Sequence, residues 1–312
     1  MTPDEKYIAR ILLQKQILQS DGQEYENLFV KIMSKHNPNF QPIKPQGSYG
    51  DRKNDGFDRK NGLYYQVYAP EDIRTKEKAT IEKLVTDFEG LYQFWNDNVT
   101  PIKKFNYVVN DKYKGAYPSL HSELARIESN HPNVEAAPFL SWQLEDVFLQ
   151  LSDDNVFDII GLIPNPLHIS DVDPSILKEV INFTLKFESP YKPESIPSNP
   201  NFEFKIQFNG LNDTIGSLLD MGRLQNHIIT TYFELNSEFT KDELRNKFTF
   251  FYKEGLKEID NLKNKSDLLF FYILEKVSPN QTKPVQDAVI VLMAYFFEYC
   301  DIFETPPKKS EN

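Results

Sequence analysis

Cysteine, histidine and long apolar runs are all scarce in this chain of 312 residues. The single cysteine, Cys300, excludes a disulfide framework and a zinc site built from cysteines. The five histidines are scattered, without the spacing of a metal-binding helix. The longest clean apolar run, Ala288 to Phe297, is too short to span a bilayer, and residues 1–16 contain no apolar core of a signal peptide. These absences predict a cytoplasmic protein with no membrane partner.

Basic residues are also fewer than acidic residues, which gives a formal net charge of −11 at pH 7. That balance argues against a protein that coats nucleic acid. The charge is uneven, because residues 31–78 contain ten Lys or Arg against six Asp or Glu, which gives +4 there and −15 elsewhere. A basic patch suits contact with a phosphate backbone, but it equally suits a solvated hairpin surface. The residues expected to contact nucleic acid are Lys44, Arg52, Lys53, Arg59 and Lys60.

The hydrophobic pattern predicts an α/β half followed by a helical half. The chain is long enough for two domains, and its 40% hydrophobic content indicates globular folding. In the first half, helical spacing alternates with β-branched and aromatic runs, which predicts a mixed sheet flanked by helices. The expected helices are 1–33 with a break at 21–22, one from about 75, 119–128, one from 141, and 174–187; the expected strands are 39–43, two within 56–68, 104–110 and 134–140.

Proline marks the predicted domain boundary. The proline-rich run 189–201 is typical of a linker, so we predict a first domain at 1–188 and a helical domain at 202–306. Residues 307–312 are predicted to be a disordered tail. Residues 202–208 fit either a short strand or the end of the linker. Further helices are expected at 218–236, 241–260, 264–277 and 285–304, and the last is apolar nearly all round, which predicts the central helix of a bundle.

The stretch Gln46–Asp72 combines glycines, carboxylates and an aromatic strand. Glycines allow tight turns, and Asp51, Asp55 and Asp58 carry the hard oxygen ligands that Mg²⁺ prefers. Alternate residues of a strand share a face, so Gln66 and Tyr68 point the same way, and Asp55 on the preceding strand could meet Gln66 across the sheet. This is the geometry of a metal-dependent phosphodiesterase. The alternative is an ordinary Gly- and Asp-rich hairpin turn.

The same residues resemble the Mrr-like, type IV restriction endonuclease branch of the PD-(D/E)xK nuclease superfamily. Asp55 matches the family's Asp, Gln66 matches its Gln, and Tyr25-Glu26 resembles its aromatic–Glu pair on the first helix. The resemblance implies a restriction-endonuclease-like mixed sheet and Mg²⁺ or Mn²⁺ held by Asp55, Gln66 and Glu26. It also implies a DNA substrate and a homodimer, since many such nucleases cut two strands as dimers.

One position departs from the family, because Tyr68 stands where a catalytic lysine is expected. A phenol cannot replace an ammonium group that orients water and neutralises charge. Either the lysine has moved or catalysis is weak or absent. Lys83 on the following helix is the candidate for a moved lysine, with Lys76 and Lys78 as alternatives; each also fits an ordinary solvated helix face.

The segments FFYILEKVSP and VLMAYFFEYCDIFETP resemble the C-terminal helical domains of effectors from bacterial ABC-three-component defence systems. That resemblance implies docking to a shared middle component and an SMC-like ATPase. Together the two resemblances imply a metal-dependent DNA endonuclease that acts as a defence effector. Two alternatives stay open: a nuclease fold without catalysis that binds nucleic acid or proteins, and an adaptor in which the helical domain does the main work.

Overall fold

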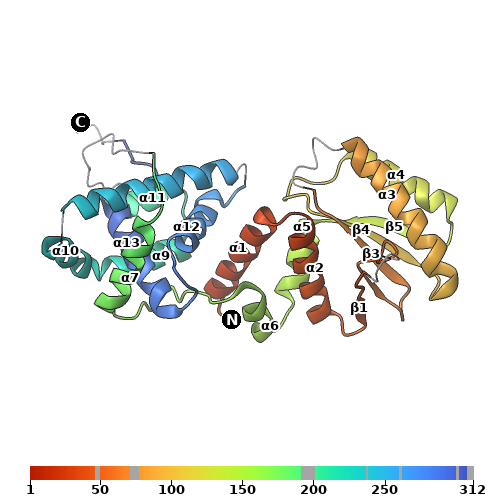
Figure 1. The fold of residues 1–312 in the computed structure, drawn as a ribbon, viewed down its shortest axis with the longest axis horizontal. Coiled ribbons are helices and arrows are strands. Elements are labelled where there is room, and N and C mark those ends of the chain that lie inside the picture. Colours follow the sequence, from red (N-terminus) through yellow and green to blue (C-terminus); the bar gives the residue numbers. More distant parts are fainter. Residues whose placement is uncertain are drawn as a thin grey trace. The chain divides into compact units, whose positions relative to one another are not determined.

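The structure is a computed structural model that describes residues 1–45, 50–70, 77–190, 201–236, 238–259, 262–299 and 302–307. Contacts divide the chain into two compact units. The sheet unit comprises Gln16–Ile159, and the helical unit comprises Met1–Lys15 together with Ile160–Asn312. Figure 1 labels most of the elements of the two units.

The described residues of the sheet unit form one mixed sheet in the order β1-β2-β3-β4-β5. The three strands β1, β2 and β3 are antiparallel neighbours, whereas β4 and β5 run parallel to β3. The predicted α/β class with a mixed sheet is therefore confirmed. The strands are β1 (Phe40–Pro42), β2 (Gly56–Asp58), β3 (Leu63–Tyr68), β4 (Lys104–Val109) and β5 (Glu135–Phe139).

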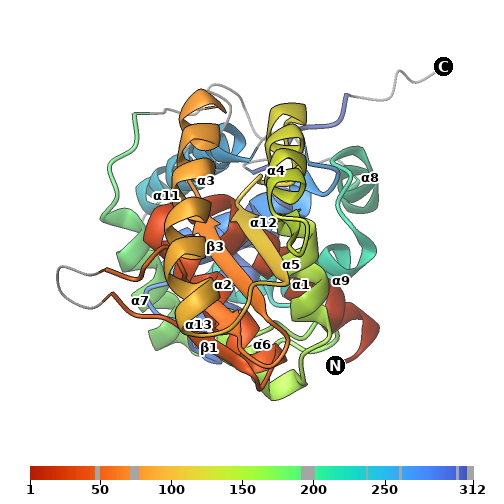
Figure 2. The same ribbon diagram turned by 90° about the vertical axis from the view of Figure 1, so that its right-hand side faces the viewer.

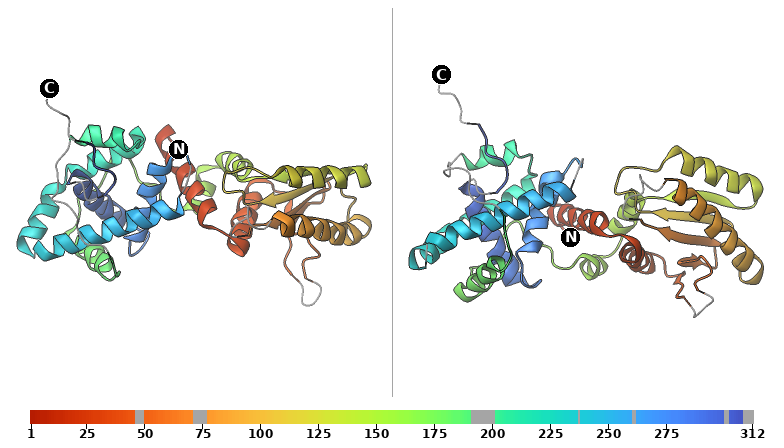
Figure 3. Two further views of the ribbon diagram at one scale, coloured as in Figure 1. Left: turned by 90° about the horizontal axis from the view of Figure 1, so that it is seen from above. Right: turned by 45° about the horizontal axis from the view of Figure 1, so that its top comes forward.

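Helices cover both faces of this sheet. The helices α3 and α4 contribute buried leucines, isoleucines and phenylalanines to a core that also contains Tyr64, Phe105 and Tyr107 of the strands. Both helices lie over the same sheet face in Figure 2, and they run next to each other in both views of Figure 3. On the opposite face, Phe29 packs on Tyr65 at 5.4 Å between ring centroids. The helices are α2 (Gly22–His36), α3 (Glu77–Leu91), the π-helix η3 (Tyr92–Asn96), α4 (Pro118–Asn130), α5 (Ser141–Leu149) and α6 (Asp153–Ile160).

The helical unit is built around α13 (Lys283–Glu298), whose residues from Val285 to Phe297 are buried. Its neighbours include α7, α9, α10 and α12, as Figure 1 shows for α7 and α9. The predicted apolar helix at the centre of a bundle is confirmed. The other helices are α1 (Pro3–Gln19, which ends in the sheet unit), α7 (Pro174–Leu185), α8 (Phe202–Phe208), α9 (Asp213–Arg223), α10 (Asn226–Leu235), α11 (Glu238–Glu258) and α12 (Lys265–Lys276).

Two features of the helical unit differ from the sequence expectations. Residues Phe202–Phe208 form a helix instead of a strand, because the side chain of Asn201 accepts a hydrogen bond from the Phe204 N–H and Lys205 points inward. The buried Lys205 ammonium donates to the carbonyls of Phe297 and Ile302, at 2.6 and 2.8 Å. The predicted single helix 218–236 is two helices, α9 and α10.

The division between units also lies earlier than the expected linker. The helix α7 packs against α11 and α13, so it groups with the helical unit although the predicted first domain extended to residue 188. Residues 1–15 group there too, since Tyr7 donates to Asp267 at 2.5 Å. Most of the predicted linker, residues 191–200, lies outside the described residues. In the described part of the chain, no helix has the length and apolar character needed to cross a membrane.

The contact between α9 and α13 depends on Gly222. A Cβ atom there would lie 2.9 Å from the Ala294 Cβ and 3.0 Å from the Ile290 carbonyl oxygen. We predict that Gly222→Ala lowers the free energy of unfolding by about 1–3 kcal/mol, because the overpacked helices must separate.

Gly216, on the same helix, provides the control. A Cβ atom there would meet Ile206 at an ordinary 3.4 Å. Gly216→Ala should be neutral or stabilising by up to about 1 kcal/mol. Urea denaturation of both variants tests the prediction, and equal stabilities would contradict it.

Candidate functional site

Asp55 lies at the start of β2, where the chain comes beside the central strand. Its backbone N–H donates to the Tyr65 carbonyl at 3.0 Å, and its Oδ2 accepts a hydrogen bond from the Val67 N–H at 2.6 Å. The carboxylate therefore lies next to the peptide that joins Gln66 to Val67. Asp55 is 4% exposed and Gln66 is 5% exposed, so the structure brings both into a buried position.

The amide of Gln66 is not satisfied by the described part of the protein. Its Oε1 is buried without a hydrogen-bond partner there, and its Nε2 reaches the Val67 carbonyl at only 3.4 Å. Leaving a buried polar atom unpaired costs about 1–3 kcal/mol. An unpaired acceptor beside a carboxylate is the arrangement expected where a donor or a cation binds.

Burial and neighbouring carboxylates perturb Asp55. Loss of solvation is the main reason why its pKa rises from 3.8 to about 7, and the hydrogen bond from Val67 opposes this rise. The charges of Glu26, Asp51 and Asp87 raise the pKa further. Glu26, on α2, is thus close enough to act on Asp55. A carboxyl group whose pKa is raised by burial and by neighbouring carboxylates is typical of functional sites.

Two lysines converge on Asp87, a carboxylate of α3 that is 1% exposed. Lys53 Nζ lies 3.0 Å from Oδ1, and Lys83 Nζ lies 2.6 Å from Oδ2. The contact with Asp87 is the main cause that raises the pKa of Lys53, and the charges of Asp51 and Asp55 add to it. Lys83 Nζ also lies 5.6 Å from the centre of the Tyr68 ring. The proposed moved lysine therefore stands over the residue that occupies the lysine position of the resembled family.

Tyr68 packs on Tyr107 of β4, with ring centres 6.1 Å apart. The Tyr107 hydroxyl is buried without a hydrogen-bond partner in the described chain. Burial first, and then the charges of Asp87, Tyr68 and Asp55, raise the pKa of Tyr107 above its ordinary value. A neutral phenol, whose hydroxyl is unpaired among the residues described, therefore lies close enough to Asp87 and Asp55 for their charges to act on it.

The remaining predicted residues lie in different places. Lys44, Arg52, Arg59 and Lys60 are exposed. Lys53 adjoins the acidic cluster, a name used for Glu26, Asp51, Asp55 and Asp87. The Lys78 side chain is 91% exposed and pairs with Glu82 at 3.8 Å. Lys76 lies outside the described residues, as do residues 46–49 of the glycine-rich turn.

Asp58, a further carboxylate of the motif, stabilises its own hairpin. Its oxygens accept hydrogen bonds from the Asn37 side chain at 3.0 Å and from the Asn61 side chain at 2.8 Å. These bonds use the oxygens that the sequence motif offered to a cation.

The donors for a metal ion here would be Asp55, Glu26 and the Gln66 amide oxygen. Oxygen donors of this kind fit Mg²⁺ or Mn²⁺, and the unpaired Gln66 Oε1 has room for a new partner. No group of three His, Cys, Asp or Glu side chains that could hold a metal is found among the residues the structure describes. Such an ion would therefore need the amide and water in addition to the two carboxylates.

Asp87 and Tyr107 are not among the site residues that the sequence pattern predicts. The spacing of Lys83 and Asp87 by four residues marks an ion pair on a helix, but this pattern is also common on solvated surfaces. The distinguishing signal is that Asp87 falls in line with the apolar residues Leu84, Phe88 and Leu91 on the buried face of α3.

The helices α7 to α13 form the bundle that contains the second resemblance. Residues 175–304 match the family model of C-terminal domain 10 of the ABC-three component systems. This match confirms the resemblance of the C-terminal part and links the protein to ABC-three-component defence systems. No curated protein and no solved structure gives a significant match. The matched region does not include the sheet unit, so the resemblance of that unit to nucleases stays a prediction.

Because the pKa of Asp55 is raised, we predict that the ionised carboxylate needed to bind a metal also destabilises the folded protein when no metal is bound. At low pH the carboxyl is protonated in both the folded and unfolded states. As pH rises from about 4 to about 7, the unfolded state ionises first, so stability is lost, by at most about 4 kcal/mol. Asp55→Asn keeps an acceptor for Val67 but carries no charge.

We expect Asp55→Asn to melt at a higher temperature than the wild type at pH 8 without metal, and at a similar temperature at pH 4. Adding Mg²⁺ or Mn²⁺ should raise the melting temperature of the wild type but not of the variant. Thermal melts at both pH values give the measurement. A variant less stable at pH 8 would contradict the buried-charge explanation.

Proposed function

We propose that the chain is a metal-dependent DNA endonuclease and the effector of an ABC-three-component defence system. The observation that carries the proposal is the buried Asp55, with its raised pKa, beside the unpaired Gln66 oxygen. Evolution towards stability alone would remove such a pair, because both groups are costly to bury. The mixed sheet, with three antiparallel strands followed by two parallel ones, gives the element order that the nuclease resemblance implies.

Each residue of the cluster has a role in this proposal. Asp55, Glu26 and Gln66 hold Mg²⁺ or Mn²⁺, which supplies an activated water and neutralises charge on the phosphate when bound. Lys83 and Lys53 then bring two ammonium groups to the same place. Because Asp87 pairs with both, the lysines are held toward the site and can stabilise negative charge on the scissile phosphate.

The helical unit supplies the connection to the defence system. The match to C-terminal domain 10 supports a role in which this unit docks to other components, with a middle component and an SMC-like ATPase as the proposed partners. In this proposal DNA is the substrate, and two copies of the chain cut the two strands. The net charge of −11 disfavours non-specific DNA binding, which suits an effector that cuts DNA slowly until its partners engage it.

Tyr68 favours a second candidate, a nuclease fold that binds nucleic acid or partner proteins without cutting. The aromatic ring fills the position of the family's lysine and packs on Tyr107. In that case Lys53 and Lys83 would serve binding alone. The two candidates differ in one outcome, which is whether phosphodiester bonds are broken.

A plasmid cleavage assay with Mg²⁺ and then Mn²⁺ tests the first candidate. The wild-type chain should nick plasmid DNA, and Asp55→Asn should reduce the rate by at least about 100-fold because a metal ligand is lost. The same assay is repeated with the co-purified products of neighbouring genes. Absence of cleavage in both preparations would favour the binding protein.

The two lysines make a separate prediction. Lys83→Met and Lys53→Met should each lower the cleavage rate about tenfold, and the double variant should lose about 100-fold or more, since each removes one positive charge near the phosphate. Lys78→Met is the control, because its side chain is 91% exposed. If Lys78→Met lowers the rate as much as the other two, the lysines act through overall charge instead of position.

A further inference from the structure

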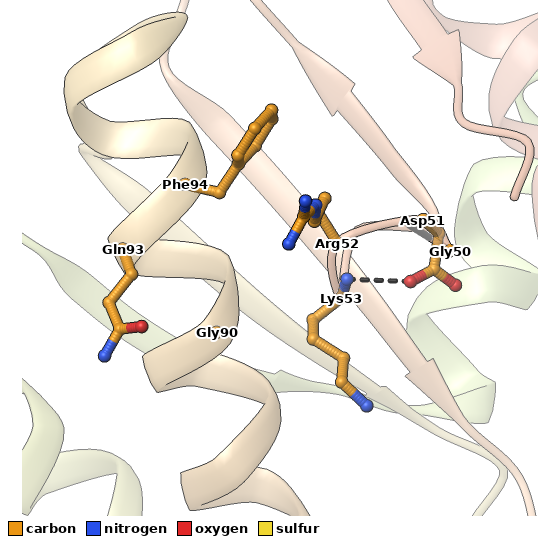
Figure 4. Close-up of a pocket in the computed structure, with 7 residues that line it drawn as sticks. All are labelled: Gly50, Asp51, Arg52, Lys53, Gly90, Gln93 and Phe94. Carbon is orange, nitrogen blue, oxygen red and sulfur yellow. Dashed lines mark hydrogen bonds between the residues drawn. The ribbon is translucent and has the colours of Figure 1, made fainter. Parts of the chain in front are cut away.

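A surface hollow of about 520 Å³ adjoins the acidic cluster. One wall is the loop Gly50–Lys53, and the other is the end of α3 and the start of η3, with Gly90, Gln93 and Phe94. Figure 4 shows the Arg52 side chain reaching from the loop toward Phe94. The volume lies within the range of small-molecule sites, about 300–1,000 Å³.

The loop wall has an unusual and fixed backbone. Arg52 and Lys53 are consecutive non-glycine residues with φ of 57° and 64°, a region that such residues rarely adopt. The Asp51 carboxylate accepts a hydrogen bond from the Lys53 N–H at 2.7 Å, and the Arg52 carbonyl accepts one from the Trp95 indole at 3.2 Å. These contacts hold the loop backbone beside η3, and the exposed Arg52 side chain projects from it.

The helix wall presents an aromatic ring and an amide. Phe94 is half-buried and Gln93 is exposed, on a π-helix, a form that is frequent at functional sites. The Arg52 guanidinium lies 5.1 Å from the centre of the Phe94 ring. The Lys53 stem packs closely against Gly90, where a Cβ atom would lie 3.1 Å from the Lys53 Cγ.

We propose that this hollow binds one unpaired nucleobase of the strand whose phosphate lies at Asp55. Because the Arg52 guanidinium already lies over the Phe94 ring, a flat base can stack on the outer face of that guanidinium, on a platform that Phe94 supports from beneath. The Gln93 amide can donate to and accept from the base edge. Lys53 connects the hollow with the candidate metal site, because it lines the hollow and also pairs with Asp87 beside Asp55.

The inference rests on the proposed function and narrows its substrate to single-stranded or locally melted nucleic acid. A duplex keeps its bases stacked and paired, so it cannot fill the hollow without extruding a base. A protein partner is less suited, since the wall combines one ring with a guanidinium, an ammonium, a carboxylate and an amide.

The test measures binding without cleavage. Fluorescence anisotropy of the full chain in EDTA is recorded with a labelled twelve-nucleotide oligothymidine strand and with its duplex. The wild type should bind the single strand more tightly than the duplex. Phe94→Leu should weaken single-strand binding about tenfold, because stacking is lost while volume is kept. Phe157→Leu is the matched control, as Phe157 is a 41% exposed phenylalanine of α6, away from the hollow.

A second variant keeps the test valid if Phe94→Leu fails to fold. Gln93→Ala removes an exposed amide, leaves the packing of Phe94 intact, and should weaken binding of the single strand about threefold. Wild-type affinity in both variants would overturn the proposal. Preference for the duplex, or equal losses in Phe157→Leu, would also overturn it.

Competition by thymidine monophosphate separates two sources of the base. If the hollow binds a base that is part of a strand, thymidine monophosphate should compete only weakly with the oligonucleotide. Full displacement of the oligonucleotide by micromolar monophosphate would assign the hollow to a free nucleotide and overturn the proposal. The cleavage assay is independent of this result. If binding depends on Phe94 but no cleavage occurs, the endonuclease is refuted and the base site is kept. If cleavage occurs but binding does not depend on Phe94, the base site is refuted and the endonuclease is kept.

Discussion

The hydrogen bond from the Val67 N–H to the Asp55 carboxylate is the contact on which the candidate site depends. Its donor belongs to β3, which is paired on both sides, by β2 and β4, and so has little freedom to move. The bond holds a carboxylate in a place where water is largely excluded, and burial makes its ionisation costly. A cation that binds there would restore the lost solvation. Affinity for a cation and the cost of the buried charge thus have the same origin.

The positive side of the site is organised by one residue in the same way. Lysine side chains are long and flexible, so an ammonium group is poorly positioned unless something holds it. Asp87 holds two of them from different elements, the loop before β2 and the helix after β3. The loop in turn is attached to η3 through Trp95. The acidic cluster, the lysines and the hollow therefore form a connected arrangement within the sheet unit.

The sequence was sufficient for features that depend on local pattern. The mixed sheet followed from β-branched and aromatic runs, the break between α1 and α2 followed from Asp21-Gly22, and the burial of α13 followed from its apolar circumference. The closeness of Asp55 and Gln66 could be predicted because neighbouring antiparallel strands have a definite register.

Features that depend on tertiary contacts could not be predicted. The alternating Phe202–Phe208 segment is typical of a strand, and its helix is explained by the Asn201 cap together with the burial of Lys205 against the end of α13. Asp87 looks like one half of a surface ion pair until the fold places Lys53 against it. The π-helix η3 has no sequence signal that we can name.

The path of the chain through the two units has a consequence for biosynthesis. The sheet unit is one continuous segment, Gln16–Ile159, whereas the helical unit needs both residues 1–15 and everything after 160. A ribosome releases the chain from its N-terminus, so the sheet unit can fold while the helical unit still lacks α7 to α13. Its first helix, α1, must wait for Asp267 of α12 before Tyr7 finds its partner. In each newly made molecule, the part proposed to be catalytic would then form before the part proposed to receive its partners.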